Sequence, residues 1–194
     1  MANKCAVILA GGEGKRMKSD KPKTLSEVMG KPMLQWVIDA LRKSGVDNIC
    51  VVKGYKKECI EEYIATLDYN VSSVYQAERL GTGHAVMMAK EYINDNDTIV
   101  VLCGDTPLVK EDTLKKLFDY HVENGYHATV LTTEVDNPTG YGRIIRDENK
   151  DLLKIVEQKD ATEEEKQTKE KRIEESCRKK GEKETLTEAA GIDL

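Results

Sequence analysis

The sequence lacks the patterns that mark several common classes of protein. Its five cysteines include no C-x-x-C pair, and its three histidines have no zinc-ligand spacing, which argues against a disulfide scaffold and a zinc site. The apolar run "CAVILA" breaks at Gly11-Gly12 and is too short for a signal peptide or a membrane span. We therefore expect a cytoplasmic protein with buried thiols at Cys5, Cys50 and Cys103.

Two standard phosphate-binding motifs are also missing. The sequence does not match a Walker A loop, because Leu9 stands where the first glycine of that motif belongs and Arg16 stands where its serine or threonine belongs. The dinucleotide fingerprint fails because Met17 stands where its third glycine belongs, which disfavours a dinucleotide-dependent dehydrogenase. The net charge of −5 argues against a general nucleic-acid binder. Any anion site is therefore expected to be local.

The chain does contain alternating strand-like and helix-like segments. Apolar runs predict strands at 5–9, 48–52, 71–75 and 98–103, amphipathic stretches predict helices at 31–45, 57–67, 82–93 and 111–125, and three more strand-like segments lie at 127–135, 142–147 and 152–158. Repeated β-α units predict an α/β fold with a Rossmann-like, open, mostly parallel sheet and helices on both faces. Nucleotides bind such sheets at the carboxyl ends of the strands.

The hydrophobic pattern stops at Lys159. Between Lys159 and Glu188 few residues are apolar and most are charged, so this segment cannot bury much surface. We therefore expect a single domain over residues 1–158, followed by a charged helical or disordered tail over 159–194 that adds no strand to the sheet.

The stretch "LAGGEGKRMKSDKPK" (9–23) directly follows the first predicted strand. Its glycines allow backbone N–H groups to approach phosphates closely. Arg16 can fork across phosphate oxygens, and Lys23 can add a second point charge. Two cations on one loop suit a reaction at an α-phosphate with pyrophosphate leaving. A basic surface turn is the alternative interpretation.

Two further stretches complete the candidate site. Asp105 comes just after the strand at 98–103, where a carboxylate can hold Mg²⁺ against a triphosphate, although Gly-Asp-Thr-Pro also suits a plain turn. "QAERLGTGHA" (76–85) offers backbone and hydroxyl groups to a base and a ribose. We expect His84 in it to be a structural or helix-start residue rather than a catalytic base.

Together these stretches resemble the sugar-nucleotide pyrophosphorylase family. The resemblance is closest to the uridylyltransferase domain of bacterial bifunctional N-acetylglucosamine-1-phosphate uridylyltransferase/glucosamine-1-phosphate acetyltransferases. It covers about residues 4–170 and rests on "LAGGEGKRMKSDKPK", "QAERLGTGHA", "CGDTPL", "NPTGYGRIIRD" and "IVEQKDAT", in the family's order.

The resemblance implies a role for each matching residue. Gln76, Gly81 and Thr82 would read the uridine, where a glutamine amide can pair with a base edge in both directions. Gly140 and Glu157 would contact the amino sugar. The alternative interpretations are a plain turn at Gly140 and a solvated strand end at Glu157. The implied catalytic residues are Arg16 and Lys23; the implied substrate-binding residues are Leu9, Ala10, Gly11, Gly12, Gly14, Lys23, Gln76, Gly81, Thr82, Gly140 and Glu157; and the implied metal ligand is Asp105.

The resemblance also implies the reaction and its partners. N-acetylglucosamine 1-phosphate would attack the α-phosphorus of UTP, with Mg²⁺ as cofactor, to give UDP-N-acetylglucosamine and pyrophosphate. No covalent enzyme intermediate is needed, so the absence of a Ser/His/Asp or Cys/His set is no objection. The expected partners include neither nucleic acid nor membrane, and a monomer is expected because the trimerising β-helix domain is absent.

The sequence departs from the family after "TEEEKQTKE". The family continues into an asparagine-containing strand, further sugar-pocket residues and a second Mg²⁺ ligand, whereas "KRIEESCRKKGEKETLTEAAGIDL" stands here. This predicts a truncated chain whose fold is incomplete at the C-terminus. A non-catalytic UTP-binding remnant and an unstable fragment are the alternative hypotheses.

Overall fold

The structure is a computed structural model that describes residues 3–14, 20–78, 80–149 and 151–177. The chain divides into two compact units, Met1–Lys115 and Lys116–Leu194. This division differs from the single domain over 1–158 that the sequence predicts.

The first unit is built on a parallel four-stranded sheet. Its strands are β1 (Lys4–Ala10), β4 (Asn48–Lys53), β5 (Ser72–Tyr75) and β6 (Thr98–Cys103). They lie in the order β5-β4-β1-β6, and every neighbouring pair is parallel. The chain builds outward from β1 to β5 and then returns to the free side of β1 with β6. The strand order therefore reverses between β1 and β6, the arrangement that places ligand sites in doubly wound folds.

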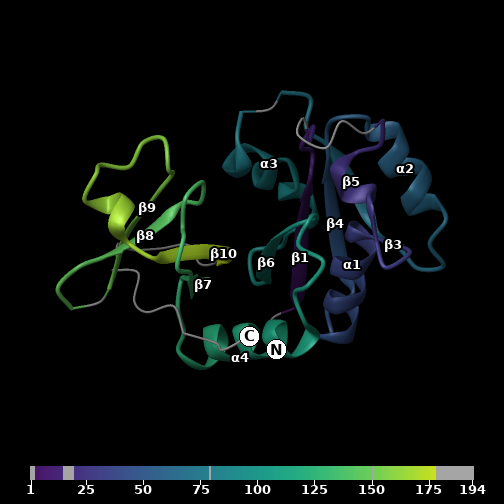
Figure 1. Cartoon of the computed structure of the whole chain (residues 1–194). Coiled ribbons are helices and arrows are strands. Elements are labelled where there is room, and N and C mark those ends of the chain that lie inside the picture. The colour runs from purple at the N-terminus through teal and green to yellow at the C-terminus, as the bar shows by residue number, and fades with distance from the viewer. Residues whose placement is uncertain (1–2, 15–19, 79, 150, 178–194) are drawn as a thin grey trace. The chain divides into compact units, whose positions relative to one another are not determined.

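Helices cover both faces of this sheet, as the sequence predicts. Figure 1 shows α1 (Met33–Lys43) and α2 (Lys57–Ala65) on one side and α3 (Thr82–Met88) on the other. The predicted helix at 82–93 is shorter, because α3 ends at Met88 and a short 3-10 helix follows at Lys90–Tyr92. A second 3-10 helix (Lys23–Leu25) and the two-stranded pair β2 (Glu27–Val28) and β3 (Lys31–Pro32), which the sequence did not predict, connect β1 to α1.

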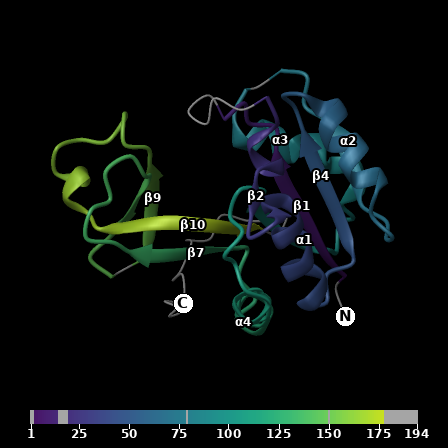
Figure 2. The ribbon, with the colours of Figure 1, turned by 45° about the vertical axis from the view of Figure 1, so that its right-hand side comes forward.

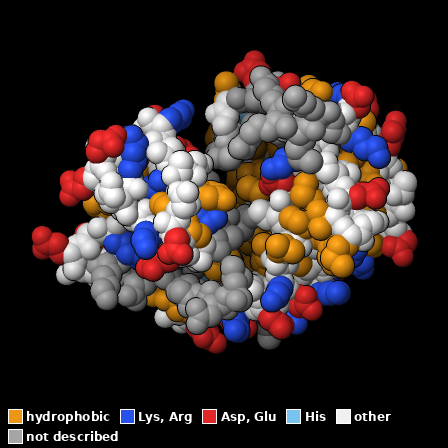
Figure 3. All heavy atoms as spheres, viewed as in Figure 1, with side chains coloured by type: hydrophobic (Ala, Val, Ile, Leu, Met, Phe, Trp, Pro, Cys, Tyr) orange, Lys and Arg blue, Asp and Glu red, His pale blue; other side chains and the backbone are white. Residues whose placement is uncertain are grey.

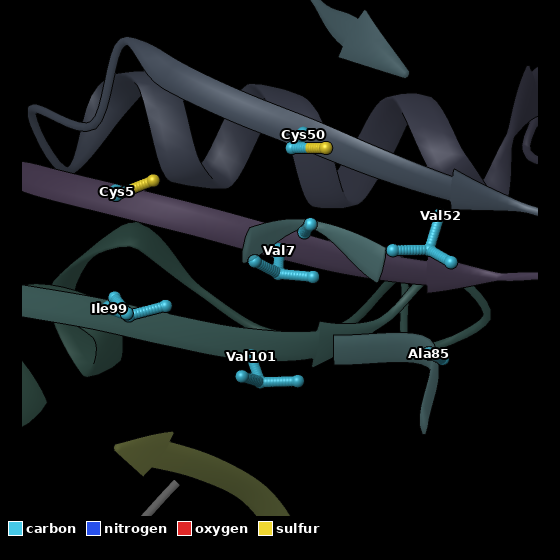
Figure 4. Packing of buried hydrophobic residues seen from close by; sticks show 8 residues of the cluster. Cys5, Val7, Cys50, Val52, Ala85, Ile99 and Val101 are labelled. Atoms are coloured by element: carbon cyan, nitrogen blue, oxygen red, sulfur yellow. The ribbon is translucent and has the colours of Figure 1, made fainter. Parts of the chain in front are cut away.

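The core under α3 follows from the alternation of side chains along the strands. Every second residue of β1, β4 and β6 points to the same face, and Figure 4 shows these side chains with Ala85 of α3. The cluster comprises Cys5, Val7, Cys50, Val52, Ala85, Ala89, Ile99 and Val101. The predicted burial of Cys5 and Cys50 is confirmed, and burial raises the pKa of Cys5 to about 11 and that of Cys50 to about 12.

The second unit carries an antiparallel sheet. Helix α4 (Glu111–Glu123) runs across the boundary and leads to β7 (Ala128–Glu134), β8 (Arg143–Arg146), β9 (Leu152–Val156), a 3-10 helix (Glu165–Gln167) and β10 (Glu170–Cys177). Strand β10 pairs with both β7 and β8, and β8 pairs with β9. Figure 2 shows β10 lying along β7.

Strand β10 corrects the prediction for the end of the chain. The sequence predicts a helical or disordered tail over 159–194 that adds no strand, whereas Glu170–Cys177 pair with Ala128–Glu134. The mostly charged sequence "EKRIEESC" gives no local strand signal, and the pairing comes from a partner strand distant in the sequence. Thr132 of β7 donates a hydrogen bond of 2.7 Å to Glu170, and the guanidinium of Arg146 in β8 lies 2.7 Å from the same carboxylate.

The visible surface carries charges of both signs. Figure 3 shows the described Lys and Arg side chains interspersed with Asp and Glu side chains on this face. An anion approaching it would therefore meet positive charge only locally. Among the described residues, no helix has the length and apolar character that crossing a bilayer requires.

Candidate functional site

The loop after β1 depends on glycine at two positions. Gly14 has a φ of +61°, and a Cβ there would lie 2.8 Å from the Cβ of Lys23. Gly54, at the end of β4, packs so closely that its Cβ would lie 2.7 Å from the carbonyl oxygen of Gly11. The backbone N–H of Tyr55 donates to that same carbonyl at 3.2 Å. The loop is therefore held against the end of β4 on one side and against Lys23 on the other.

Lys23 and Asp105 form an ion pair at this end of the sheet. Lys23 begins the 3-10 helix after the loop, and Asp105 lies two residues after Cys103, the last residue of β6. The Nζ of Lys23 contacts Oδ2 of Asp105. Both side chains are partly exposed, at 37% and 29%. The pair places one cation and one carboxylate at the carboxyl ends of the parallel strands, where such folds bind ligands.

Gln76 follows β5 and is held by three hydrogen bonds. Its backbone N–H donates to Lys53 at 2.9 Å. Its side-chain Nε2 donates to the carbonyl oxygen of Gly81 at 3.2 Å and to Nδ1 of His84 at 3.0 Å. Gln76 is 5% exposed. Both amide hydrogens are therefore used inside the protein, and the pairing of this amide with a base stays a prediction.

These residues line one cavity of about 320 Å³ in the first unit. The lining brings together most of the predicted site of that unit: Leu9, Gly11, Gly12, Gly14, Lys23, Gln76, Gly81, Thr82 and Asp105. Ala10 is 1% exposed and is not part of the lining. Arg16, the other predicted catalytic residue, lies outside the described residues. The cavity adjoins the point between β1 and β6 where the strand order reverses.

Three lining residues were not predicted: Thr24, Ala85 and Cys103. Cys103 is only partly buried, so its predicted burial is wrong. Its place at the end of β6, next to Gly104 and Asp105, is the signal that points to the cavity. Thr24 is buried, and among the described residues its hydroxyl has no hydrogen-bond partner. The position of Thr24 directly after Lys23 is the sequence signal that could have identified it as a cavity residue.

The two predicted sugar-binding residues lie in the second unit. Gly140 adopts a φ of +87°, which accords with the turn interpretation, and its N–H donates to Oε1 of Gln158 at 3.1 Å. Glu157 directly follows β9, and its Oε1 would lie 3.5 Å from a Cβ on Gly142. The neighbouring guanidinium of Arg143 also donates to Gln158, at 2.6 Å. Sugar binding by Gly140 and Glu157 stays a prediction.

The comparisons with known proteins agree with this fold. The chain belongs to the MobA-like NTP transferase domain family, whose sequence profile matches residues 6–169. By family, then, it is a nucleotidyltransferase domain. A solved chain from Bacillus anthracis, assigned as a glucose-1-phosphate thymidylyltransferase in complex with sucrose, superposes with a TM-score of 0.73 over 90% of this chain and 71% of its own. The sequence identity of that pair is 22%, so the likeness concerns the fold.

Closer sequence relatives carry the name "Bifunctional protein GlmU". That of Clostridioides difficile is 62% identical over 161 residues, which are 83% of this chain and 34% of the relative. That of Clostridium beijerinckii is 54% identical over 84% of this chain and 35% of the relative. That of Caldanaerobacter subterraneus is 50% identical over 85% of this chain and 35% of the relative. The chain thus spans about a third of the length of these curated relatives.

Proposed function

We propose that the first unit binds UTP and that the chain transfers its uridylyl group to N-acetylglucosamine 1-phosphate. The single observation that carries the proposal is the cavity at the strand-order reversal, which joins a glycine-rich loop, the Lys23–Asp105 pair and Gln76. The names of the GlmU relatives and the residues shared with the uridylyltransferase pattern support the choice of substrates.

The reaction needs positioning and charge neutralisation rather than a covalent intermediate. A phosphate oxygen of the sugar phosphate forms a bond to the α-phosphorus of UTP, and the bond from that phosphorus to the bridging oxygen breaks, which releases pyrophosphate. The glycine loop would hold the triphosphate through backbone N–H groups. Lys23 would neutralise charge that develops on the phosphates as the bond breaks. In this proposal Arg16 supplies the second cation of the loop.

The donor set at Asp105 fits Mg²⁺. The ammonium of Lys23 already lies against this carboxylate, so the site accommodates a cation. Among the described residues no cluster of three or more His, Cys, Asp or Glu side chains would hold a metal alone. Mg²⁺ typically takes one or two carboxylates together with substrate phosphates. Asp105 would hold the ion, which would supply charge neutralisation of the triphosphate.

A pyrophosphate-release assay with UTP, N-acetylglucosamine 1-phosphate and Mg²⁺ tests the proposal. We expect turnover by the chain that exceeds that of an Arg16→Ala variant. Release that does not exceed this control would exclude catalysis.

A second candidate function is UTP binding without turnover. The observation that favours it is that every residue lining the cavity belongs to the first unit, so that this unit by itself offers a site for UTP. Titration calorimetry with UTP separates the two candidates, because it detects binding in the absence of any reaction.

A further inference from the structure

We propose that His84 is a positioning residue that fixes the amide of Gln76 and thereby makes the cavity selective for a pyrimidine with a ring N–H. The inference rests on the proposed binding of UTP and extends it to the choice of base. The side chain of Gln76 makes two hydrogen bonds, to the carbonyl of Gly81 at 3.2 Å and to His84 at 3.0 Å.

The carbonyl of Gly81 identifies which end of the Gln76 amide lies next to it. A carbonyl oxygen only accepts, so the atom 3.2 Å from it must be the NH₂ group of Gln76. The same NH₂ group lies 3.0 Å from Nδ1 of His84. Because an NH₂ group only donates, Nδ1 must accept, and the neutral imidazole therefore carries its proton on Nε2.

With both of its hydrogens used, the amide of Gln76 has only its oxygen left to offer. That oxygen lies 3.3 Å from the position that a Cβ of Gly11 would occupy, and Gly11 lines the cavity. Among the described residues the oxygen has no hydrogen-bond partner. Gln76 is also 5% exposed, which restricts the turning of its side chain.

A Gln76 amide that offers only its acceptor oxygen discriminates between pyrimidines. N3 of uracil carries a hydrogen and can donate to the oxygen of Gln76, whereas N3 of cytosine is itself an acceptor and would face that oxygen without a hydrogen. An unpaired polar group in a closed site lowers affinity strongly. Loss of the acceptor at His84 would leave only the 3.2 Å bond to Gly81 to hold the amide in this orientation, so that the amide turns more readily and presents its NH₂ group, which suits cytosine.

Two variants of nearly identical shape test this role. His84→Asn keeps an acceptor oxygen close to the position of Nδ1, while His84→Leu has a similar shape and no acceptor. Titration calorimetry with UTP and with CTP gives the preference for UTP in each chain. We expect His84→Leu to lose on the order of tenfold or more of this preference, and His84→Asn to keep most of it. Thermal unfolding of both variants checks that the comparison concerns folded chains.

The outcomes separate a positioning role from a structural one. Equal preferences in all three chains would overturn the inference, and so would equal losses in both variants, because the acceptor would then be irrelevant. A nitrogen-15 correlation spectrum of the histidines in the nucleotide-free chain adds a test that needs no UTP. We expect the Nε2–H tautomer at His84, and the Nδ1–H tautomer would contradict the inference. Absence of UTP binding with the expected tautomer would instead overturn the proposed function.

Discussion

The ammonium group of Lys23 contacts the carboxylate of Asp105 across 82 positions of the sequence. One partner lies just beyond the glycine loop and the other just beyond the apolar strand β6, so the pair joins the two chain segments that follow β1 and β6. Lys23 and Asp105 therefore place a cation and a carboxylate next to each other in the lining of the same cavity.

Lys23→Met should lower turnover more than it lowers UTP affinity. A preorganised donor aimed at developing charge contributes mainly in the transition state, and its loss typically lowers kcat on the order of 10²–10³-fold. Steady-state kinetics gives kcat, and titration calorimetry gives the affinity for UTP. The control is Lys31→Met, since Lys31 forms an ion pair of 2.7 Å with Asp39 at similar exposure but does not line the cavity. Equal losses of kcat/KM and UTP affinity would mean that Lys23 acts on the ground state alone.

Gly14→Ala should destabilise the loop and weaken UTP binding together. The left-handed backbone at Gly14 costs a non-glycine residue about 1–2 kcal/mol, and the new Cβ would press on the side chain of Lys23. Gly30→Ala is the matched control, because Gly30 also has a positive φ, of +76°, but a Cβ at this position would meet nothing within 4 Å. Denaturant unfolding and UTP titration of both variants provide the measurement. A loss of UTP affinity in Gly30→Ala as large as that in Gly14→Ala would contradict the role given to the Lys23 contact.

Bound UTP should protect Cys103 from alkylation. Cys103 lines the cavity, while Cys59 in α2 is partly exposed elsewhere and serves as the internal control. At a UTP concentration ten times its Kd, labelling of Cys103 should be about tenfold slower. Peptide mapping by mass spectrometry measures each site. Cys5 and Cys50 should stay unlabelled at pH 8, since burial raises the pKa of their thiols to about 11 and about 12. Equal protection of Cys59 and Cys103 would argue against a local effect.

Glu170→Gln should destabilise the protein in a pH-dependent way. The hydrogen bond from Arg146 holds the pKa of Glu170 below its ordinary value of 4.5. A lowered pKa in the folded state means that the ionised carboxylate stabilises the fold above the ordinary pKa, and that this contribution is lost as the pH falls through the folded-state pKa. We expect a deficit of about 1–3 kcal/mol near pH 7.

Denaturant unfolding of the wild type and of Glu170→Gln at several pH values measures this deficit. The deficit should be constant above the ordinary pKa of 4.5 and should shrink as the pH falls below it. The control is Glu163→Gln, because Glu163 pairs with Lys166 with its own side chain 89% exposed and should contribute little at any pH. A deficit that persists unchanged in strong acid would contradict the role of the charge.

The local parts of this fold could be predicted from the sequence. Strand β6 was predicted with its observed bounds, because an uninterrupted apolar run such as "TIVVLC" suits a strand covered on both faces. Most of the cavity lining of the first unit also lies in stretches that the sequence analysis singled out, since glycines after a buried strand and an aspartate after another identify the carboxyl edge of a parallel sheet, but Thr24, Ala85 and Cys103 were not predicted. Each of these signals lies within a few residues of the strand that it follows.

The parts that depend on partners distant in the sequence could not be predicted. Strand β10 is charged along much of its length, and its pairing with β7 and β8 makes it a strand. The orientation of the Gln76 amide follows from a carbonyl and an imidazole that the composition of "QAERLGTGHA" does not place. Cys103 was predicted to be buried by the same apolar pattern as Cys5, although it ends its strand at the cavity.

The strand order of the first unit also bears on how the chain folds during synthesis. The glycine loop and Lys23 leave the ribosome early, yet β6, which leads to Asp105, is the last of the four strands to be made and docks beside the first. Parallel neighbours of this kind form slowly, because a long intervening segment must close before they gain contacts. A nascent chain should therefore become competent for nucleotide binding in a single late step, once β6 has emerged and paired with β1.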